Sequence, residues 1–221
     1  MRDHRRRTTL VMAGVVALAA LVGGCTTAGA DTRGYKLAPP RSVGEYEKRS
    51  GDFRYVGKID CAGQPSDADC YQGATEVIGI GISPRDANRI VRNASGTGAY
   101  YRSGPPEGAA DTKWLAFRGL QGDIPEPDQA VDRFFRSIAK REQVPFRGIK
   151  LVRGTVEDFG IGGYDGAVMR CRKAKGTYNG APEAVCVWAD HSTVAAVNAP
   201  LSMSELADLT RQLYKTSRKK K

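Results

Sequence analysis

Three alternating segments in the last third of the chain constrain its fold more than any other feature. Residues 167–172, 184–189 and 193–197 are each typical of a β-strand, and a turn signal, Tyr164-Asp165-Gly166, precedes the first. A turn at residues 190–191 or 191–192 is expected between the last two strands. Consecutive strands with short connections favour an antiparallel sheet.

Two cysteines indicate how the first two of these strands pair. If Cys171 lies opposite Cys186, then Met169 lies opposite Trp188, because side chains on one face of a strand are two residues apart. The third strand then brings Ala195 near Cys186, where a small side chain leaves room for a bridge. One register satisfies all three observations, and we therefore expect a Cys171–Cys186 disulfide.

Two amphipathic helices complete the predicted fold. One begins at Pro127, and the other begins at Ser202, where Glu205 completes a capping box. Their apolar stripes are core residues by pattern: Ala130, Val131, Phe134, Phe135, Ile138 and Ala139 in the first, and Met203, Leu206, Leu209 and Leu213 in the second. The pattern predicts an α+β fold, a two-layer sandwich with an antiparallel sheet and two helices packed on one face. Further elements are expected as strands at 53–59, 76–82, 98–102 and 113–120 and a short helix at 84–92.

Cys25 indicates where the protein is located. Four arginines among residues 2–7 precede an apolar run at 10–22, which ends at Gly23-Gly24-Cys25. This is the layout of a bacterial export signal followed by a lipobox, so residues 1–24 are predicted to be a signal peptide. Cys25 is then expected to become the first residue and to carry diacylglycerol and acyl chains such as palmitate. Two alternatives stay open: cleavage at Ala28-Gly29-Ala30 by ordinary signal peptidase, or an uncut anchor.

The predicted organisation is a tether, one domain and a tail. Residues 25–38 are a lipid-anchored tether, 39–214 a single α+β extracytoplasmic domain, and 215–221 a basic tail expected to be solvated. Residues 1–24 contribute +3 and residues 215–221 contribute +5 to the formal charge of +10, so the rest of the chain carries only +2. A nearly neutral body argues against nucleic acid as a partner.

The other four cysteines are expected to form two disulfides, because an exported chain meets oxidising conditions. A zinc site is the competing interpretation, but the close C-x2-C pairs that it needs are absent. Three pairings are possible in principle, and the local one is favoured: Cys61–Cys70 and Cys171–Cys186.

Several segments resemble a group of actinobacterial, Streptomyces-type, exported or membrane-anchored lipoproteins of unknown function. The segments that carry the resemblance are residues 122–127 (GDIPEP) with Ala130-Val131-Asp132 and Phe134-Phe135, then 165–171 (DGAVMRC), 186–194 (CVWADHSTV) and 37–46. The Cys61–Cys70 loop departs from the group. The resemblance implies a location and an architecture but no activity, ligand or catalytic residue.

Candidate catalytic and metal sites do not form a recognisable set. His191 is flanked by Asp190 and Ser192, but three consecutive turn residues cannot form a catalytic relay, so a turn role is favoured. Gly79-x-Gly81 is predicted to be a turn or bulge and Asp67-x-Asp69 a solvated loop. Adjacent carboxylates at 157–158 make a poor pair for glycoside hydrolysis.

We therefore expect a lipoprotein on the outer side of the cell membrane, with a non-catalytic binding or interaction domain and no cofactor. Its expected partners are the membrane, through the lipid on Cys25, and an envelope protein or cell-wall component. The alternatives are an envelope hydrolase whose site is assembled from distant residues, and an accessory or sensory subunit of a membrane complex.

Overall fold

The computed structural model describes residues 29–49, 53–56, 84–104, 113–140, 149–176 and 181–221. The predicted signal peptide, the lipid site at Cys25, the Cys61–Cys70 bridge, Asp67, Asp69 and the Gly79-x-Gly81 segment lie outside these residues.

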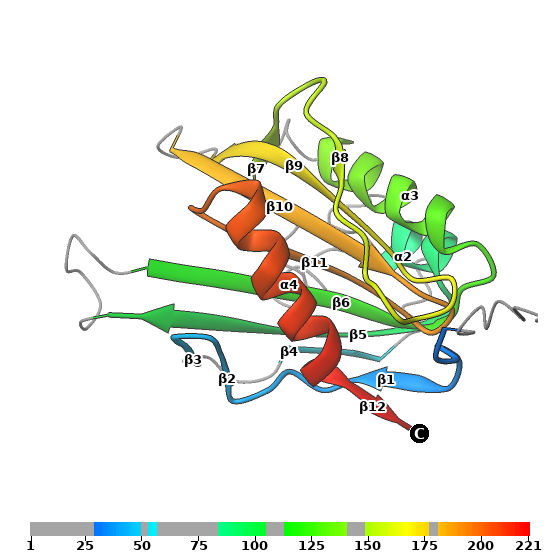
Figure 1. Cartoon of the computed structure of the whole chain (residues 1–221). Coiled ribbons are helices and arrows are strands. Elements are labelled where there is room, and N and C mark those ends of the chain that lie inside the picture. The colour runs from blue at the N-terminus through cyan, green and yellow to red at the C-terminus, as the bar shows by residue number, and fades with distance from the viewer. Residues whose placement is uncertain (1–28, 50–52, 57–83, 105–112, 141–148, 177–180) are drawn as a thin grey trace, which may run out of the picture.

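One antiparallel sheet organises the molecule (Figure 1). Its strands follow the spatial order β2-β3-β5-β6-β11-β10-β9-β7, while β4 pairs with β5 and β8 pairs with β9. The strands are β2 (Ser42–Val43), β3 (Tyr46–Lys48), β4 (Phe53–Val56), β5 (Arg92–Ser103), β6 (Lys113–Asp123), β7 (Ile149–Leu151), β8 (Glu157–Asp158), β9 (Val168–Gly176), β10 (Pro182–Ala189) and β11 (Thr193–Ala199).

The predicted register of the first two cysteine-bearing strands is confirmed. Cys171 on β9 lies opposite Cys186 on β10 and is bonded to it, and Met169 lies opposite Trp188. Ala195, however, pairs with Trp188 rather than with Cys186. The reason is the turn: the Asp190 N–H donates to the Thr193 carbonyl at 2.8 Å, so residues 191–192 are the central pair and the third strand shifts by two residues.

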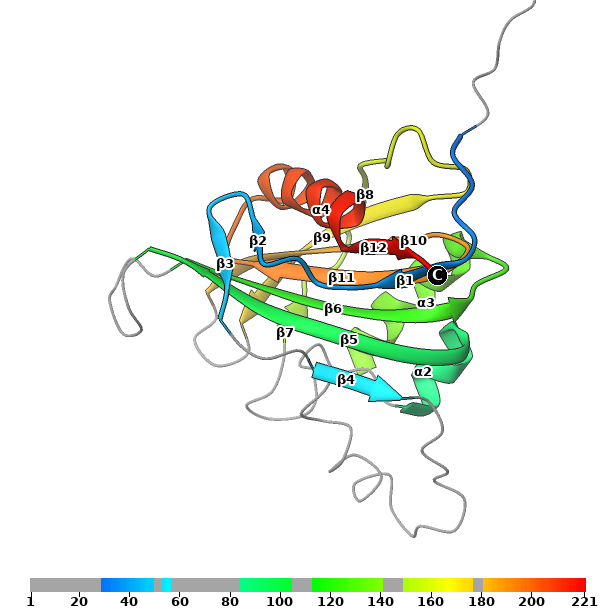
Figure 2. The same cartoon turned by 90° about the horizontal axis from the view of Figure 1, so that it is seen from below.

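The helices lie on opposite faces of the sheet, which corrects the prediction that both pack on one face (Figure 2). Helix α3 (Pro127–Lys140), together with α2 (Pro84–Ile90), packs on a core that includes Val185 and Val187. Helix α4 (Met203–Ser217) packs on the other core, which includes Cys186 and Trp188. Successive side chains of β10 point to opposite faces and are apolar on both, so each face needs a covering helix.

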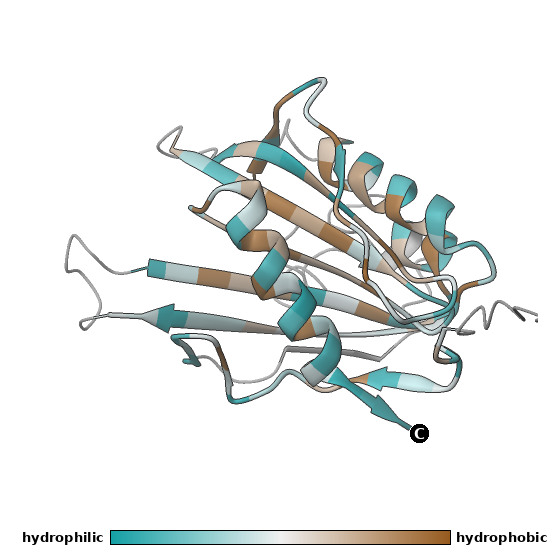
Figure 3. Ribbon diagram, in the orientation of Figure 1, coloured by the Kyte–Doolittle hydropathy of each residue, from teal (hydrophilic) through white to brown (hydrophobic). Residues whose placement is uncertain are grey.

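The apolar stripes of the two helices are largely as predicted. All the expected core residues of α3 are buried except Ala139, which is exposed, and Leu209 of α4 is only partly buried. Ser202 and Glu205 form the predicted capping box at the start of α4. Figure 3 shows the result: brown hydrophobic segments in the central strands and teal on the outer sides of both helices. The α+β class and the antiparallel sheet are confirmed, with the sheet between two helical layers.

The two ends of the described chain form a second, two-stranded sheet. Strand β1 (Tyr35–Leu37) pairs antiparallel with β12 (Arg218–Lys220), and Leu37 packs over Gly119 of β6. We call this pair the β1–β12 ribbon. Residues expected to belong to a free tether and a solvated tail therefore pair with each other, and Arg218 is buried.

Candidate functional site

A buried ion pair lies behind the β10–β11 turn. Asp190 is fully buried, and its carboxylate accepts hydrogen bonds from the Ser192 N–H at 2.7 Å, the Thr193 N–H at 2.8 Å and the Thr193 hydroxyl at 2.9 Å. Aspartate is favoured in such turns because its short side chain bonds nearby backbone amides. Arg218 Nε lies 2.8 Å from Asp190 Oδ2, at ion-pair distance, although its N–H is not aligned for a hydrogen bond.

Three tyrosines surround the Arg218 guanidinium. Its central carbon lies 4.1 Å from the ring centre of Tyr35, 4.2 Å from that of Tyr214 and 5.3 Å from that of Tyr164. Each ring face attracts the cation. Burial raises the pKa of the Tyr214 hydroxyl, and the negative charge of Asp190 raises it further. Arg218 thus joins the end of α4, strand β1 and the β10–β11 turn into one unit.

Residues 30–34 cross this turn and are held by backbone contacts. The Ala30 N–H donates to the Gly163 carbonyl at 3.0 Å, and the Thr32 hydroxyl donates to the Asp165 carbonyl at 3.0 Å. The His191 N–H donates to the Thr32 hydroxyl oxygen at 3.3 Å. The first described residues are therefore part of the folded domain, and they form one wall of a cavity.

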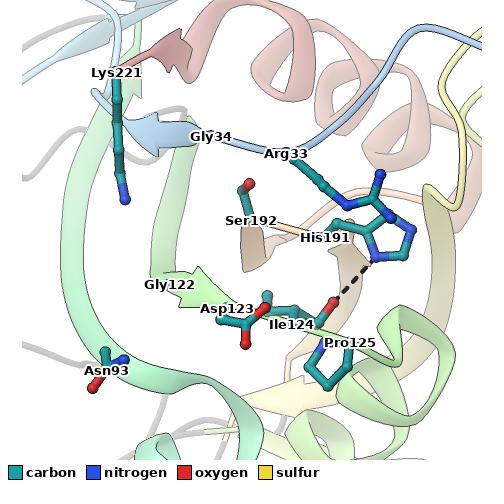
Figure 4. A pocket seen from close by; sticks show the side chains of 10 residues that line it. All are labelled: Arg33, Gly34, Asn93, Gly122, Asp123, Ile124, Pro125, His191, Ser192 and Lys221. Atoms are coloured by element: carbon teal, nitrogen blue, oxygen red, sulfur yellow. Dashed lines mark hydrogen bonds between the residues drawn. The ribbon is translucent and has the colours of Figure 1, made fainter.

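This cavity has a volume of about 590 Å³ and opens beside the ribbon (Figure 4). It is walled by residues from five places: the β1 approach, the start of β5, the end of β6 with the connection to α3, the β10–β11 turn and the residue after β12. They are Arg33, Gly34, Asn93, Gly122, Asp123, Ile124, Pro125, His191, Ser192 and Lys221. We call it the turn cavity. Its lining carries two cationic side chains, Arg33 and Lys221, and one acidic side chain, Asp123. The Arg33 guanidinium also lies 3.7 Å from the carboxylate of Asp31, in an exposed ion pair.

The His191 ring is fixed at the wall of the turn cavity. Nδ1 lies 3.2 Å from the Ile124 carbonyl oxygen, which can only accept, so Nδ1 carries the proton and donates it. The other side of the ring faces Gly166, whose φ is +65°. A Cβ on Gly166 would lie 2.5 Å from His191 Nε2, so a glycine is required there for both backbone and steric reasons. His191 is a turn residue as predicted, and it also lines a cavity that sequence reasoning missed.

The side chains of Asp190, His191 and Ser192 do not join in a relay. Asp190 pairs with Arg218 and Thr193, whereas the His191 ring nitrogen Nδ1 bonds to the Ile124 carbonyl. A Ser-His-Asp triad needs the carboxylate to accept the proton on that nitrogen. In this turn, Asp190 therefore forms a structural ion pair, whereas His191 and Ser192 line the neighbouring cavity.

A second charged cluster ties α3 to the sheet. The guanidinium of Arg170 on β9 contacts three carboxylates, those of Asp128 at 2.8 Å, Asp132 at 2.9 Å and Asp158 at 2.9 Å. Asp158 is one of the two adjacent carboxylates, residues 157 and 158, that were considered above as a pair for glycoside hydrolysis. In the structure its carboxylate is engaged in an ion pair with Arg170.

A groove of about 460 Å³ lies between α2 and α3 and is rich in basic side chains. Most of the cationic groups there already have partners within the protein. Arg133 donates to the Arg89 carbonyl at 2.9 Å and to Gln129 Oε1 at 3.0 Å, while Asp86 accepts ion pairs from Arg89 and Lys140. The groove is thus the more basic of the two hollows, but Arg89, Arg133 and Lys140 are held by oxygens of the protein itself.

Within the described residues, no group of three or more His, Cys, Asp or Glu side chains is placed to hold a metal ion. No helix in the described part of the chain is long and apolar enough to cross a membrane. Comparison of the chain with protein-family models, curated proteins and solved structures found no match.

Proposed function

We propose that the protein is a lipid-anchored, extracytoplasmic binding domain that holds a small anionic ligand in the turn cavity. The turn cavity with its two rim cations is the observation that carries this proposal. The export signal with Cys25 in a lipobox supports the location, and the Cys171–Cys186 disulfide is consistent with an oxidising compartment.

The chemistry of the walls indicates what kind of ligand fits. The volume lies within the range of small-molecule sites, which is about 300–1,000 Å³. Arg33 offers a guanidinium for an anionic oxygen, and Asn93 and Ser192 come from different walls and offer hydrogen bonds. The carboxylate of Asp123 repels an anion placed beside it, but it accepts hydrogen bonds from hydroxyl groups of a ligand. A hydroxylated phosphate, such as glycerol phosphate, matches this combination of charge and hydrogen bonding.

Titration of the purified full chain with glycerol phosphate, followed by calorimetry or by NMR chemical shifts, tests the proposal. Wild type is expected to bind, with shifts concentrated at the cavity walls. The double variant Arg33→Gln/Lys221→Gln is expected to bind roughly tenfold more weakly, because each exposed cation contributes a modest attraction. Asp123→Asn is expected to bind more tightly, since it removes a repelling charge.

Lys150→Gln/Arg153→Gln is the matched control, because it also removes two exposed cations and both lie outside the cavity. It is expected to bind as wild type does. Equal weakening by Lys150→Gln/Arg153→Gln and by the cavity variant would mean that only net charge matters, and the turn cavity would lose its assigned role.

The anchor is tested separately by metabolic labelling with a fatty acid. Wild type is expected to carry the label and to sediment with membranes, whereas Cys25→Ala is expected to lose the label. Unchanged labelling of Cys25→Ala would remove the lipid anchor from the proposal while leaving the binding measurement intact.

A further inference from the structure

The β1–β12 ribbon gathers positive charge on a short stretch of surface. Lys36, Lys219, Lys220 and Lys221 are all exposed, and Lys36 lies directly opposite Lys219 in the strand register. Like charges directly opposite each other on paired strands are destabilising. Among the described residues these lysines have no ion-pair partner, and the ribbon and its approach, residues 29–38 and 218–221, hold one acid, Asp31. Asp31 is itself paired with Arg33.

The ribbon presents these charges in a fixed arrangement. Arg218, the first residue of β12, is held by Asp190 and by three tyrosine rings, and Leu37 of β1 packs over Gly119. Lys36, which precedes Leu37, and Lys219, which follows Arg218, therefore extend from a backbone that is tied to the core. A cationic surface that is preorganised in this way loses little conformational freedom on meeting an anion.

The chain length between the predicted lipid site and the domain limits how far Ala30, at the start of the approach to the ribbon, lies from the membrane. Ala30, which bridges to Tyr164, is five residues after Cys25, a distance of at most about 18 Å for a fully extended chain. Anionic leaflets attract basic segments within about a Debye length, roughly 8–10 Å in physiological salt. We propose that the β1–β12 ribbon docks on the anionic headgroups of the leaflet that carries the lipid of Cys25. This inference rests on the lipid anchor of the proposed function.

The ribbon is a better candidate for this contact than the groove between α2 and α3. In that groove, Arg133, Arg89 and Lys140 contact carbonyl or carboxylate oxygens of the protein itself. The ribbon lysines lack such partners among the described residues, so an external anion meets them without breaking an internal contact. Docking also brings Lys221, which lines the turn cavity, to the membrane surface.

Lysine footprinting of the full, lipid-carrying chain tests the docking. The protein is reconstituted into vesicles of phosphatidylcholine alone or of phosphatidylcholine mixed with phosphatidylglycerol, and acetylation of each lysine is followed by mass spectrometry. In the anionic vesicles, Lys36 and Lys219 are expected to react about fivefold more slowly, the protection that one attracted charge gives near such a surface. Exposed reference lysines on β7 and β9, namely Lys150, Lys173 and Lys175, are expected to react equally in both vesicles.

Two double variants test whether the ribbon lysines cause the protection. Lys219→Gln/Lys220→Gln is expected to abolish the protection of Lys36, whereas the control Lys173→Gln/Lys175→Gln is expected to keep it. Equal protection in neutral and anionic vesicles, equal protection of the reference lysines, or protection of Lys36 by soluble glycerol phosphate without anionic vesicles would each overturn the docking proposal. Loss of fatty-acid labelling overturns the anchor, whereas an unprotected ribbon in a labelled protein overturns only the docking.

Discussion

One arginine on each face of the sheet links a helix to it. The carboxylate partners of Arg170, on the α3 side, are exposed to water, whereas Arg218, on the α4 side, and its partner are buried. On the α3 side, Arg170 meets three carboxylates whose side chains are 60–78% exposed. On the α4 side, Arg218 meets one carboxylate, and the two side chains are 3% and 0% exposed. Arg170 itself is 18% exposed, but water reaches all three of its partners and screens these contacts, whereas water is excluded from the Arg218 contact.

The comparison also shows which face is suited to function. The α3 core is aliphatic and aromatic, and its ionic cluster lies at the surface. The α4 face adds the disulfide and the buried pair, and that pair fixes the ribbon and the β10–β11 turn that together wall the turn cavity. A buried residue that does not line the turn cavity is therefore expected to influence its shape.

Removal of Arg218 is expected to have the largest effect on stability. Arg218→Met leaves Asp190 buried without its cation, and loss of one partner of a buried pair costs about 3–5 kcal/mol. Urea denaturation measures the free energy of unfolding. The double variant Asp190→Asn/Arg218→Met is expected to recover part of this loss, because the unpaired charge is gone; additive losses in the double variant would show that the two residues do not interact.

Loss of the disulfide is expected to come next. Cys171 and Cys186 are 15 residues apart, and closing a loop of that size contributes about 3 kcal/mol in the chain-entropy model. Cys171→Ala/Cys186→Ala should therefore unfold at a lower urea concentration than wild type. The same midpoint in both proteins would show that the bridge does not stabilise the fold.

Arg170→Met is expected to cost about 1 kcal/mol or less, although it removes three ion pairs at once. The difference from wild type should shrink further in high salt, because exposed charges are screened. Denaturation with and without added sodium chloride checks this. A loss as large as that of Arg218→Met would invalidate the ranking of the two clusters by burial.

Substitution of Glu183 on β10 is expected to have the smallest effect on the free energy of unfolding, and this effect depends most on pH. Burial raises the pKa of its carboxyl group above 4.5, so the folded state holds the proton more tightly than the unfolded state. Its contribution is therefore fully present below the unfolded pKa and is lost as pH rises through the folded pKa. Glu183→Gln is expected to be slightly more stable than wild type at neutral pH, with the difference vanishing at acidic pH. A difference that is independent of pH would contradict this.

The elements that were predictable are those with local signals. The cysteines fixed the β9–β10 register, and helical spacing with a capping box located α4. The uninterrupted apolar run of residues 184–189 was also a signal that both faces of β10 are buried, which would have separated the two helices. The Asp190–Arg218 pair had no such signal, because its partners are distant in sequence and Arg218 lies among lysines that are typical of a solvated tail. The turn cavity is walled by segments that are also distant in sequence, so it was missed as well.

The most direct test is whether the buried pair positions the proposed binding site. It compares the affinity for glycerol phosphate of Arg218→Met and Arg170→Met at a temperature where both variants are folded. Arg218→Met is expected to bind roughly tenfold more weakly than wild type, as the Arg33→Gln/Lys221→Gln variant does, because the ribbon no longer fixes the rim cations. Arg170→Met is expected to bind as wild type does. Equal affinities in the two variants would contradict the claim that Arg218 links the core to the turn cavity.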